Sequence, residues 1–272
     1  MRNRCVEPFI QPPRYLYQYY SNINNAIKNI QHRQIYLSRP SSFNDVFDCT
    51  LNWDIYDIFD FEYEIGCLAF LNTYFVENEL SFRLAEEDFA NCKTIQDVYK
   101  MCIKLEIPKK HLCDAFMVLE NKIKNNKLDR LAISCFSEEK DSLLMWAHYS
   151  NNLHGVCLQF DTNKDPDLFN NAHKVKYSSI RPKNWHYSLF VKPIDWNYEN
   201  EWRIIIETKR RRISTNAISG IIVGEHIPQE KRKQLRQFAR EHGLGYQVAK
   251  SNVNRFKIDI VEDTTLDYRI LF

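Results

Sequence analysis

A chain of 272 residues with 44% hydrophobic and 26% charged residues has the composition of a globular protein and is long enough to bury a full core. Its formal net charge of +2 lacks the basic excess that is typical of proteins binding nucleic acid through overall charge. Nowhere do about 18 apolar residues run together, and the N-terminus has no uninterrupted apolar stretch, so we expect a soluble, cytoplasmic protein without a membrane span.

The eight cysteines are scattered along the chain, and none of them forms a Cys-x-x-Cys pair or a Cys/His cluster with the spacing of a zinc site. Several lie in apolar runs, as Cys135 and Cys157 do. We therefore expect reduced thiols packed in a cytosolic protein and no bound metal.

The N-terminal region predicts a strand, a helix and a second strand. An aromatic strand is expected over residues 14–20, and Ser21 or Asn22 can cap the helix that follows, whose apolar residues recur at helical spacing. The second strand, over residues 34–38, ends in a loop that is rich in turn-forming residues.

That loop contains Asn44 and Asp45, and Asp48 follows three residues later. Such side chains can bond backbone amides of their own loop or present polar groups to a ligand. The residues alone favour the local role for Asn44 and leave both roles open for Asp45 and Asp48.

Between residues 54 and 127 the pattern becomes helical, and it contains no constellation of residues with recognisable chemistry. Thr94 to Asp97 approximates a capping box, which predicts a helix start there. We expect a helical insertion that shapes a pocket wall or offers a surface to a protein partner.

The rest of the chain returns to strands, with two helices. Strands are expected over 131–137, 155–160, 217–223, 246–249 and 256–261, and helices over 142–150, capped by Asp141, and 228–241. Strands at both ends with helices between them predict an α+β fold. We expect one domain over residues 1–272, in which 14–53 and 128–272 form a central, mostly antiparallel sheet and 54–127 is inserted.

The stretch 192–206 gathers charged and aromatic residues at the start of an apolar strand. If residues 198–206 are extended, alternation places Glu199, Glu201 and Arg203 on one face. Charged groups are costly to bury without partners. The pattern therefore indicates either a strand entrance whose charges neutralise each other or a carboxylate held by its neighbours for catalysis or ligand binding.

The sequence has no P-loop, no dinucleotide-binding G-x-G-x-x-G, no G-x-S-x-G elbow and no H-E-x-x-H. With six glycines it offers no Gly-rich phosphate cradle, so a nucleotide would be held by side chains and aromatic stacking. The basic run at residues 209–212 is typical of a solvated hairpin tip, with nucleic-acid contact as the alternative.

Several blocks in a fixed order carry a family resemblance. They are residues 16–19, 35–38, 43–48, 134–137, 145–149, 155–158 and 196–203. Together, over roughly residues 14–224, the chain resembles an uncharacterised, mostly bacterial family catalogued as domain of unknown function 2971. The family has no agreed activity. It usually has Lys where Gln18 stands, Arg near Tyr20 and Pro at Val46. If those cations bind an anion, this chain lacks them, which argues against an anionic substrate.

A second resemblance, at the level of the fold, is to the ADP-ribosyltransferase superfamily. Its early strand–helix–strand, middle segment and late Glu-x-Glu strand would correspond to Tyr17, Tyr19 and Ser38, to His148 and Tyr149, and to Glu199 and Glu201. The first strand here lacks the Arg or His anchor of that superfamily. The resemblance implies NAD as substrate, with a fixed carboxylate that stabilises positive charge on the ribose.

Three hypotheses follow. In the first, the protein is an NAD-consuming transferase or glycohydrolase in bacterial phage defence or toxin action. Its catalytic residues are Glu201, then Glu199, His148 and Tyr149, and its substrate-binding residues are Tyr17, Tyr19, Ser38, Asn44, Asp45 and Arg203. The second is a non-catalytic sensor or interaction module. The third is a metal-dependent nuclease using Asp45, Asp48 and Glu201.

Overall fold

The computed structural model describes residues 10–45, 47–49, 95–104, 130–182, 188–208 and 212–263. The chain divides into two compact units, one made of Met1–Asp48, Leu131–Ile180 and Phe190–Phe272, the other of Cys49–Arg130 and Arg181–Leu189. In the second unit the structure describes helix α4 (Ile95–Lys104), which begins directly after Thr94. The rest of the range 54–127 that we expect to be helical lies outside the described residues.

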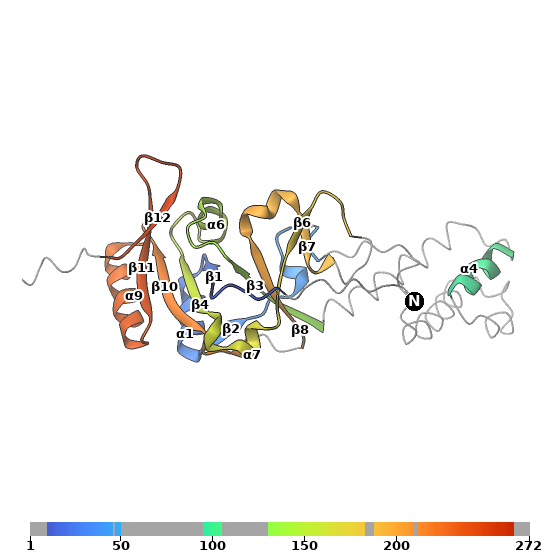
Figure 1. Ribbon diagram of the computed structural model, residues 1–272, viewed down its shortest axis with the longest axis horizontal. Helices are drawn as coiled ribbons and strands as arrows, with labels where there is room; N and C mark the ends of the chain where they lie inside the picture. The colour runs from blue at the N-terminus through green and yellow to red at the C-terminus, as the bar shows by residue number, and fades with distance from the viewer. Residues whose placement is uncertain are drawn as a thin grey trace, which may run out of the picture. The chain divides into compact units, whose positions relative to one another are not determined.

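The first unit is built on an eight-stranded sheet with the order β12-β11-β10-β4-β1-β3-β8-β5 (Figure 1). Its strands are β1 (Tyr15–Tyr20), β3 (Leu131–Ser137), β4 (Val156–Asp161), β5 (Ala172–Lys174), β8 (Glu201–Glu207), β10 (Ile218–Gly224), β11 (Gly245–Ser251) and β12 (Ile258–Val261). Its neighbouring strands are antiparallel except β10 and β11, which are parallel. The predicted α+β class with a mostly antiparallel sheet is confirmed.

Short strands form two further pairs. β2 (Gln34–Tyr36) pairs antiparallel with β9 (Arg212–Ser214), and β6 (Lys176–Ser178) pairs parallel with β7 (Val191–Pro193). Short helical turns are η1 (Pro40–Ser42), η4 (Thr162–Lys164), α7 (Pro166–Phe169) and η5 (Ile194–Glu199).

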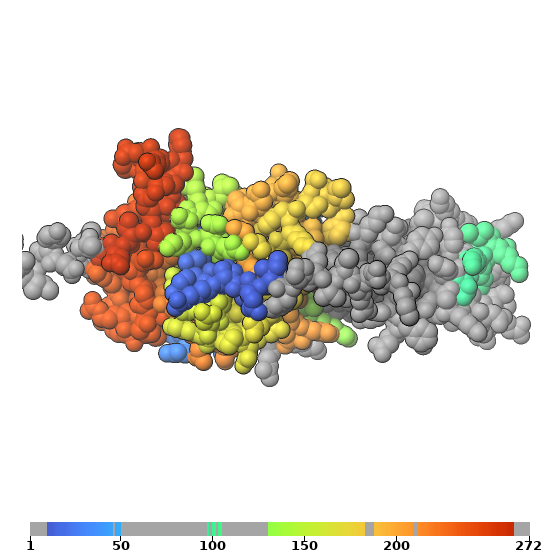
Figure 2. Space-filling view, viewed as in Figure 1, coloured from blue at the N-terminus to red at the C-terminus, as the bar shows by residue number. Residues whose placement is uncertain are grey.

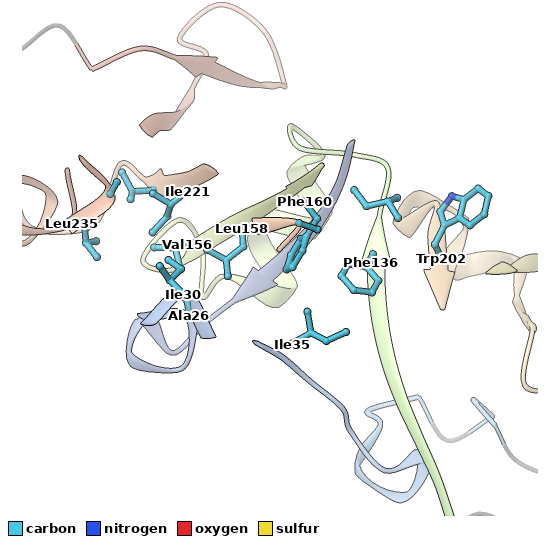
Figure 3. Packing of buried hydrophobic residues seen from close by; sticks show 14 of the residues in the cluster. Ala26, Ile30, Ile35, Phe136, Val156, Leu158, Phe160, Trp202, Ile221 and Leu235 are labelled. Carbon is cyan, nitrogen blue, oxygen red and sulfur yellow. The ribbon is translucent and has the colours of Figure 1, made fainter. Parts of the chain in front are cut away.

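One face of the sheet carries the main hydrophobic core. Alternation sends Leu158, Phe136 and Ile221 to this face. Helix α1 (Ile23–His32) covers Leu158, helix α9 (Gln229–Glu241) covers Ile221, and the Phe169 ring packs on Phe136 (Figure 3). Burying an aliphatic or aromatic side chain of this size stabilises the fold by roughly 1.5–3 kcal/mol. The helix cap expected at Ser21 or Asn22 is Asn22, whose side chain accepts a hydrogen bond from the Asn24 amide at 3.0 Å.

The opposite face carries a smaller core around Trp146 of α6 (Leu143–Tyr149). Trp146 is fully buried, meets Tyr19 edge-on at 5.2 Å and donates a hydrogen bond from Nε1 to the Lys140 carbonyl. The expectation that Asp141 caps this helix is wrong, because Ser142 is the N-cap and its hydroxyl accepts from the Met145 amide. Among the described residues, no helix is both long and apolar enough to span a membrane.

The join between β1 and β3 is the weak point of the sheet. The two strands share one paired position, Tyr17 with Ser137, whereas β1 pairs with β4 along its whole length. Beyond that position the Gln18 side chain donates to the Cys135 carbonyl at 3.1 Å, and Ser38 forms an isolated bridge with Ile133. The β3 edge is thus satisfied by a side chain and a loop, which leaves an opening between the strands.

Candidate functional site

A cavity of about 320 Å³ lies at the opening between β1 and β3. Residues from both faces of the sheet line it, including Gln18 and Phe136 from one face and Tyr17 and Cys135 from the other. Its volume is at the lower end of the range for small-molecule sites. Tyrosine and phenylalanine rings form much of its wall, from Tyr17, Tyr19, Tyr20, Tyr36, Phe43, Phe136 and Tyr149.

A cluster of five buried charged side chains adjoins this cavity: Asp48, Lys192, Glu199, Glu201 and Arg203. We call it the charged cluster. Asp48, Lys192, Glu199 and Glu201 line the cavity, and Arg203 lies behind them, with its guanidinium over the Phe43 ring. Three carboxyl groups therefore face two cations, so the cluster has a formal charge of −1 when every member is ionised.

Glu201 is tied to Arg203. Arg203 donates from Nε to Glu201 Oε1 at 2.8 Å and from Nη2 to Oε2 at 3.1 Å, and Lys192 lies 3.1 Å from Oε2. Burial alone would raise the pKa of Glu201, but Arg203 and Lys192 outweigh burial and lower it to about 2. Arg203, fully buried, also donates to Asp48 Oδ2 at 2.6 Å. Glu201 is therefore an ionised carboxylate held in a salt-bridge network.

Glu199 has a different environment. Burial and the nearby charge of Glu201 raise its pKa to about 7, against the opposing effects of Lys192 and Tyr149. The Tyr149 hydroxyl donates to Oε1 and the Lys192 ammonium donates to Oε2, each at 2.5 Å. Glu199 thus exchanges its proton near neutral pH while it faces the cavity.

The backbone reaches this arrangement in a way that alternation did not predict. Residues 194–199 form the helical turn η5 and β8 begins at Glu201, so the condition that residues 198–206 are all extended is not met. Asn200 between them adopts the left-handed conformation, with φ of 45°. Asn enters this region more readily than most residues. The reversal at Asn200 brings both carboxylates to the Lys192 ammonium.

The structure brings together most of the residues expected at the site. Those that line the cavity are Tyr17, Tyr19, Ser38, Asn44, Tyr149, Glu199 and Glu201. Arg203 supports the cavity from behind through Glu201 and Asp48. Placement of these residues in one cavity leaves their catalytic or binding roles as predictions.

His148 and Asp45 do not line the cavity. His148 is exposed on the next face of α6, where its Nδ1 lies 2.8 Å from the Tyr198 hydroxyl. Asp45 accepts a hydrogen bond from the Phe47 amide at 2.9 Å, which is the local loop role.

Three further cavity residues are Lys192, which has no expected role, and Gln18 and Tyr20, which are expected only as departures from the family pattern. Lys192 is the hub of the charged cluster: burial would lower its pKa, but Glu201, Glu199 and Asp48 raise it well above the ordinary value. The sequence does contain a signal for Lys192. It lies next to Pro193 at the start of a carboxylate-rich stretch, and a buried lysine needs an acidic partner.

The carboxylates needed by the nuclease hypothesis meet only in part. Asp48 and Glu201 share Lys192 and Arg203 as partners, so two cationic side chains already stand where a metal would bridge them. Within the described ranges, no group of three or more His, Cys, Asp or Glu side chains could hold a metal ion.

Residues 145–204 match a family model described as protein of unknown function (DUF2971). This match supports the predicted resemblance over the matched segment. The matched segment begins in α6 and ends in β8, so it contains Tyr149, Lys192, Glu199, Glu201 and Arg203. Comparison with curated proteins and with solved structures finds no match.

Proposed function

We propose that the cavity binds the nicotinamide–ribose end of NAD and that Glu199 assists cleavage of the bond between them, in a glycohydrolase or transferase reaction. The observation that carries this proposal is the different setting of two neighbouring carboxylates: Arg203 binds both oxygens of Glu201, whereas Glu199 faces the cavity and is bound by Tyr149 and Lys192. The guanidinium lowers the pKa of Glu201, and burial beside Glu201 raises the pKa of Glu199. Such separation of pKa values is how enzymes assign distinct roles to two acids.

The chemistry of the cavity supports a cationic aromatic ligand. With Glu199 ionised, the charged cluster has a formal charge of −1. Tyrosine rings line the same space, and aromatic faces attract cations at short range. The pyridinium ring of NAD satisfies both features, and the phosphates of NAD must lie away from the charged cluster, whose net charge would repel them.

In the proposed reaction the bond between ribose C1′ and nicotinamide N1 breaks, and both electrons pass to nicotinamide, which leaves as a neutral molecule. Positive charge develops on the ribose, and the Glu199 carboxylate stabilises it electrostatically. In hydrolysis, water attacks C1′ and transfers a proton to Glu199, which releases it to solvent. In transfer, an acceptor nucleophile takes the place of water.

Nicotinamide release from NAD, followed by chromatography, tests this proposal. We expect Glu199→Gln to lower the rate by roughly 100-fold or more, the usual contribution of a general base. Asp195→Asn is the matched control, since Asp195 is an exposed acid in the same turn, and it should retain the wild-type rate within about twofold. Wild-type protein that neither releases nicotinamide nor melts at a higher temperature with NAD would refute the proposal.

A non-catalytic sensor is the second candidate, and the salt-bridged state of Glu201 favours it. A sensor would bind the same ligand in the same cavity without turnover. An increase in melting temperature with NAD, abolished by Glu199→Gln, together with no product after long incubation, would select the sensor.

A further inference from the structure

Positive charge is concentrated in one part of the chain. The segment 229–257, which forms α9, β11 and the turn after β11, contains eight Lys and Arg residues against two Glu, whereas the whole chain carries a formal charge of only +2. The remaining residues are therefore acidic on balance. The modest overall charge conceals a strongly basic element.

The arginines of α9 lie in a stripe. Arg232, Arg236 and Arg240 follow one another at intervals of four residues, which places them on one side of the helix. Like charges at this spacing destabilise an isolated helix. Among the described residues, no carboxylate lies within ion-pair distance of Arg236 or Arg240. Arg236 and Arg240 therefore leave their charge available to a partner, whereas Arg232 is half-buried and its Nε is enclosed.

The turn between β11 and β12 presents an exposed aromatic ring. We call residues 252–257 the hairpin tip; it projects from the body of the sheet in Figure 2. Phe256 has a relative exposure of 102% and Val253 of 94%, the two most exposed large hydrophobic side chains described. Arg255 and Lys257 flank the ring in the sequence, and Lys257 also pairs with Asp259 at 2.5 Å. A ring this exposed contributes no burial of apolar surface to the fold.

We propose that α9 and the hairpin tip together bind a single-stranded nucleic acid, with the arginine stripe on phosphates and Phe256 stacked on a base. Proteins that bind single strands combine a basic track with aromatic rings in this way. The two elements belong to the same edge of the sheet, because α9 packs on β10 and β11 and the tip joins β11 to β12 at the end of the strand order (Figure 1).

An anionic membrane surface is the competing polyanion, and the packing of α9 argues against it. A helix that lies on a membrane inserts its apolar face. In α9 that face, with Leu235 and Ala239, is buried in the core of the sheet. Phe256 and Val253 alone would offer a small apolar area, whereas one ring is enough to stack on a base.

Fluorescence anisotropy of a labelled 20-nucleotide single strand, DNA and RNA, measured on the full chain tests the proposal. We expect binding at 50 mM NaCl that weakens at least tenfold at 200 mM, because binding releases counterions from the strand. Phe256→Ala should weaken binding about tenfold, and Arg236→Glu with Arg240→Glu should weaken it more.

Lys28→Glu with Lys104→Glu is the matched control, since both lysines are exposed on helices outside the basic segment and the change in net charge is the same. This variant should bind within about threefold of wild type. Equal weakening in the control, full affinity in Phe256→Ala, or binding to phosphatidylserine vesicles but not to the oligonucleotide would each overturn the proposal. Glu199→Gln should bind the strand normally, which separates this test from the one on NAD.

Discussion

Glu199 and Glu201 have different pKa values because different side chains surround them. Glu201 meets the buried Arg203 guanidinium through both oxygens, whereas Glu199 meets a phenol and an ammonium that it shares with Glu201 and Asp48. Burial disfavours ionisation of both, and only Glu201 has enough positive charge nearby to overcome it. Glu199 is therefore the better candidate for proton transfer, although the sequence favoured Glu201.

The rate of NAD cleavage should depend on pH through Glu199. The ionised form is required, and its pKa is about 7, so kcat/KM should rise tenfold per pH unit below about pH 7 and level off above it. A pH–rate profile between about pH 5 and 9 checks this. A profile that is flat through neutral pH would show that Glu199 is not the titrating group.

Glu201→Gln should destabilise the protein far more than Glu199→Gln. Removing the carboxylate leaves the fully buried Arg203 guanidinium short of a partner, which typically costs about 3–5 kcal/mol for a buried pair. Urea unfolding of both variants at the same pH measures the difference. Equal losses of unfolding free energy would contradict the structural role assigned to Glu201.

The sequence indicates part of the charged cluster but not all of its members. The spacing of Glu199, Glu201 and Arg203 was enough to predict a mutually neutralising cluster. Asp48 is 155 positions away from Arg203 in the chain, and no local pattern connects the two. Contacts of this kind depend on the order of strands in the sheet, which periodicity does not specify.

Among the elements, the close approach of β1 and β4 depends on Gly155. A Cβ placed on Gly155 would lie 2.1 Å from the Tyr20 carbonyl oxygen and 2.8 Å from that of Ser150. Both obstacles are backbone atoms, so a larger residue must displace a strand end.

Gly155→Ala should therefore lower the free energy of unfolding by about 1–3 kcal/mol, the usual cost of overpacking. Gly245→Ala is the control, because its nearest neighbour would be at the ordinary distance of 3.6 Å and Ala suits a strand better than Gly. Chemical denaturation of both variants measures the contrast. If Gly155→Ala is as stable as Gly245→Ala, the backbone at Tyr20 and Ser150 can shift to accept the methyl group at little cost.

Element types were predictable where periodicity was long, as in α1, β3 and α9. Alternation does not hold at residues 198–200, and the cause is local. η5 continues up to Glu199, and the left-handed turn at Asn200 restarts the alternation, so a pattern that looks like one strand belongs to two elements. The two carboxylates still lie close together, so the predicted cluster forms although the backbone conformation at residues 198–200 differs.

For the whole molecule, the charged cluster predicts how stability varies with pH. Because the folded pKa of Glu199 is raised from 4.5 to about 7, the folded state retains a proton that the unfolded chain releases. Its contribution is present below about pH 4.5 and is lost as the pH rises through 7. Glu201, lowered to about 2, contributes stability above about pH 4.5 that is lost as the pH falls towards 2.

The difference in unfolding free energy between Glu199→Gln and wild type should therefore move in favour of the variant by about 2–3 kcal/mol between pH 5 and pH 8. Taking the difference removes the contributions of the histidines, which both proteins share. Guanidinium denaturation at the two pH values measures it. A difference that does not change with pH would show that Glu199 titrates in the folded and unfolded states alike.

The single paired position between β1 and β3 has a consequence for experiments in which no substrate is known. The amides of β3 that point towards β1 should take up deuterium quickly, because few strand hydrogen bonds protect that edge. The amides that point towards β8 should exchange more slowly, because β3 and β8 pair along their whole length. A compound that enters this seam bridges the two halves of the sheet and should retard uptake on both sides at once. Mass spectrometry of that exchange can therefore screen metabolites for a ligand before any turnover has been observed.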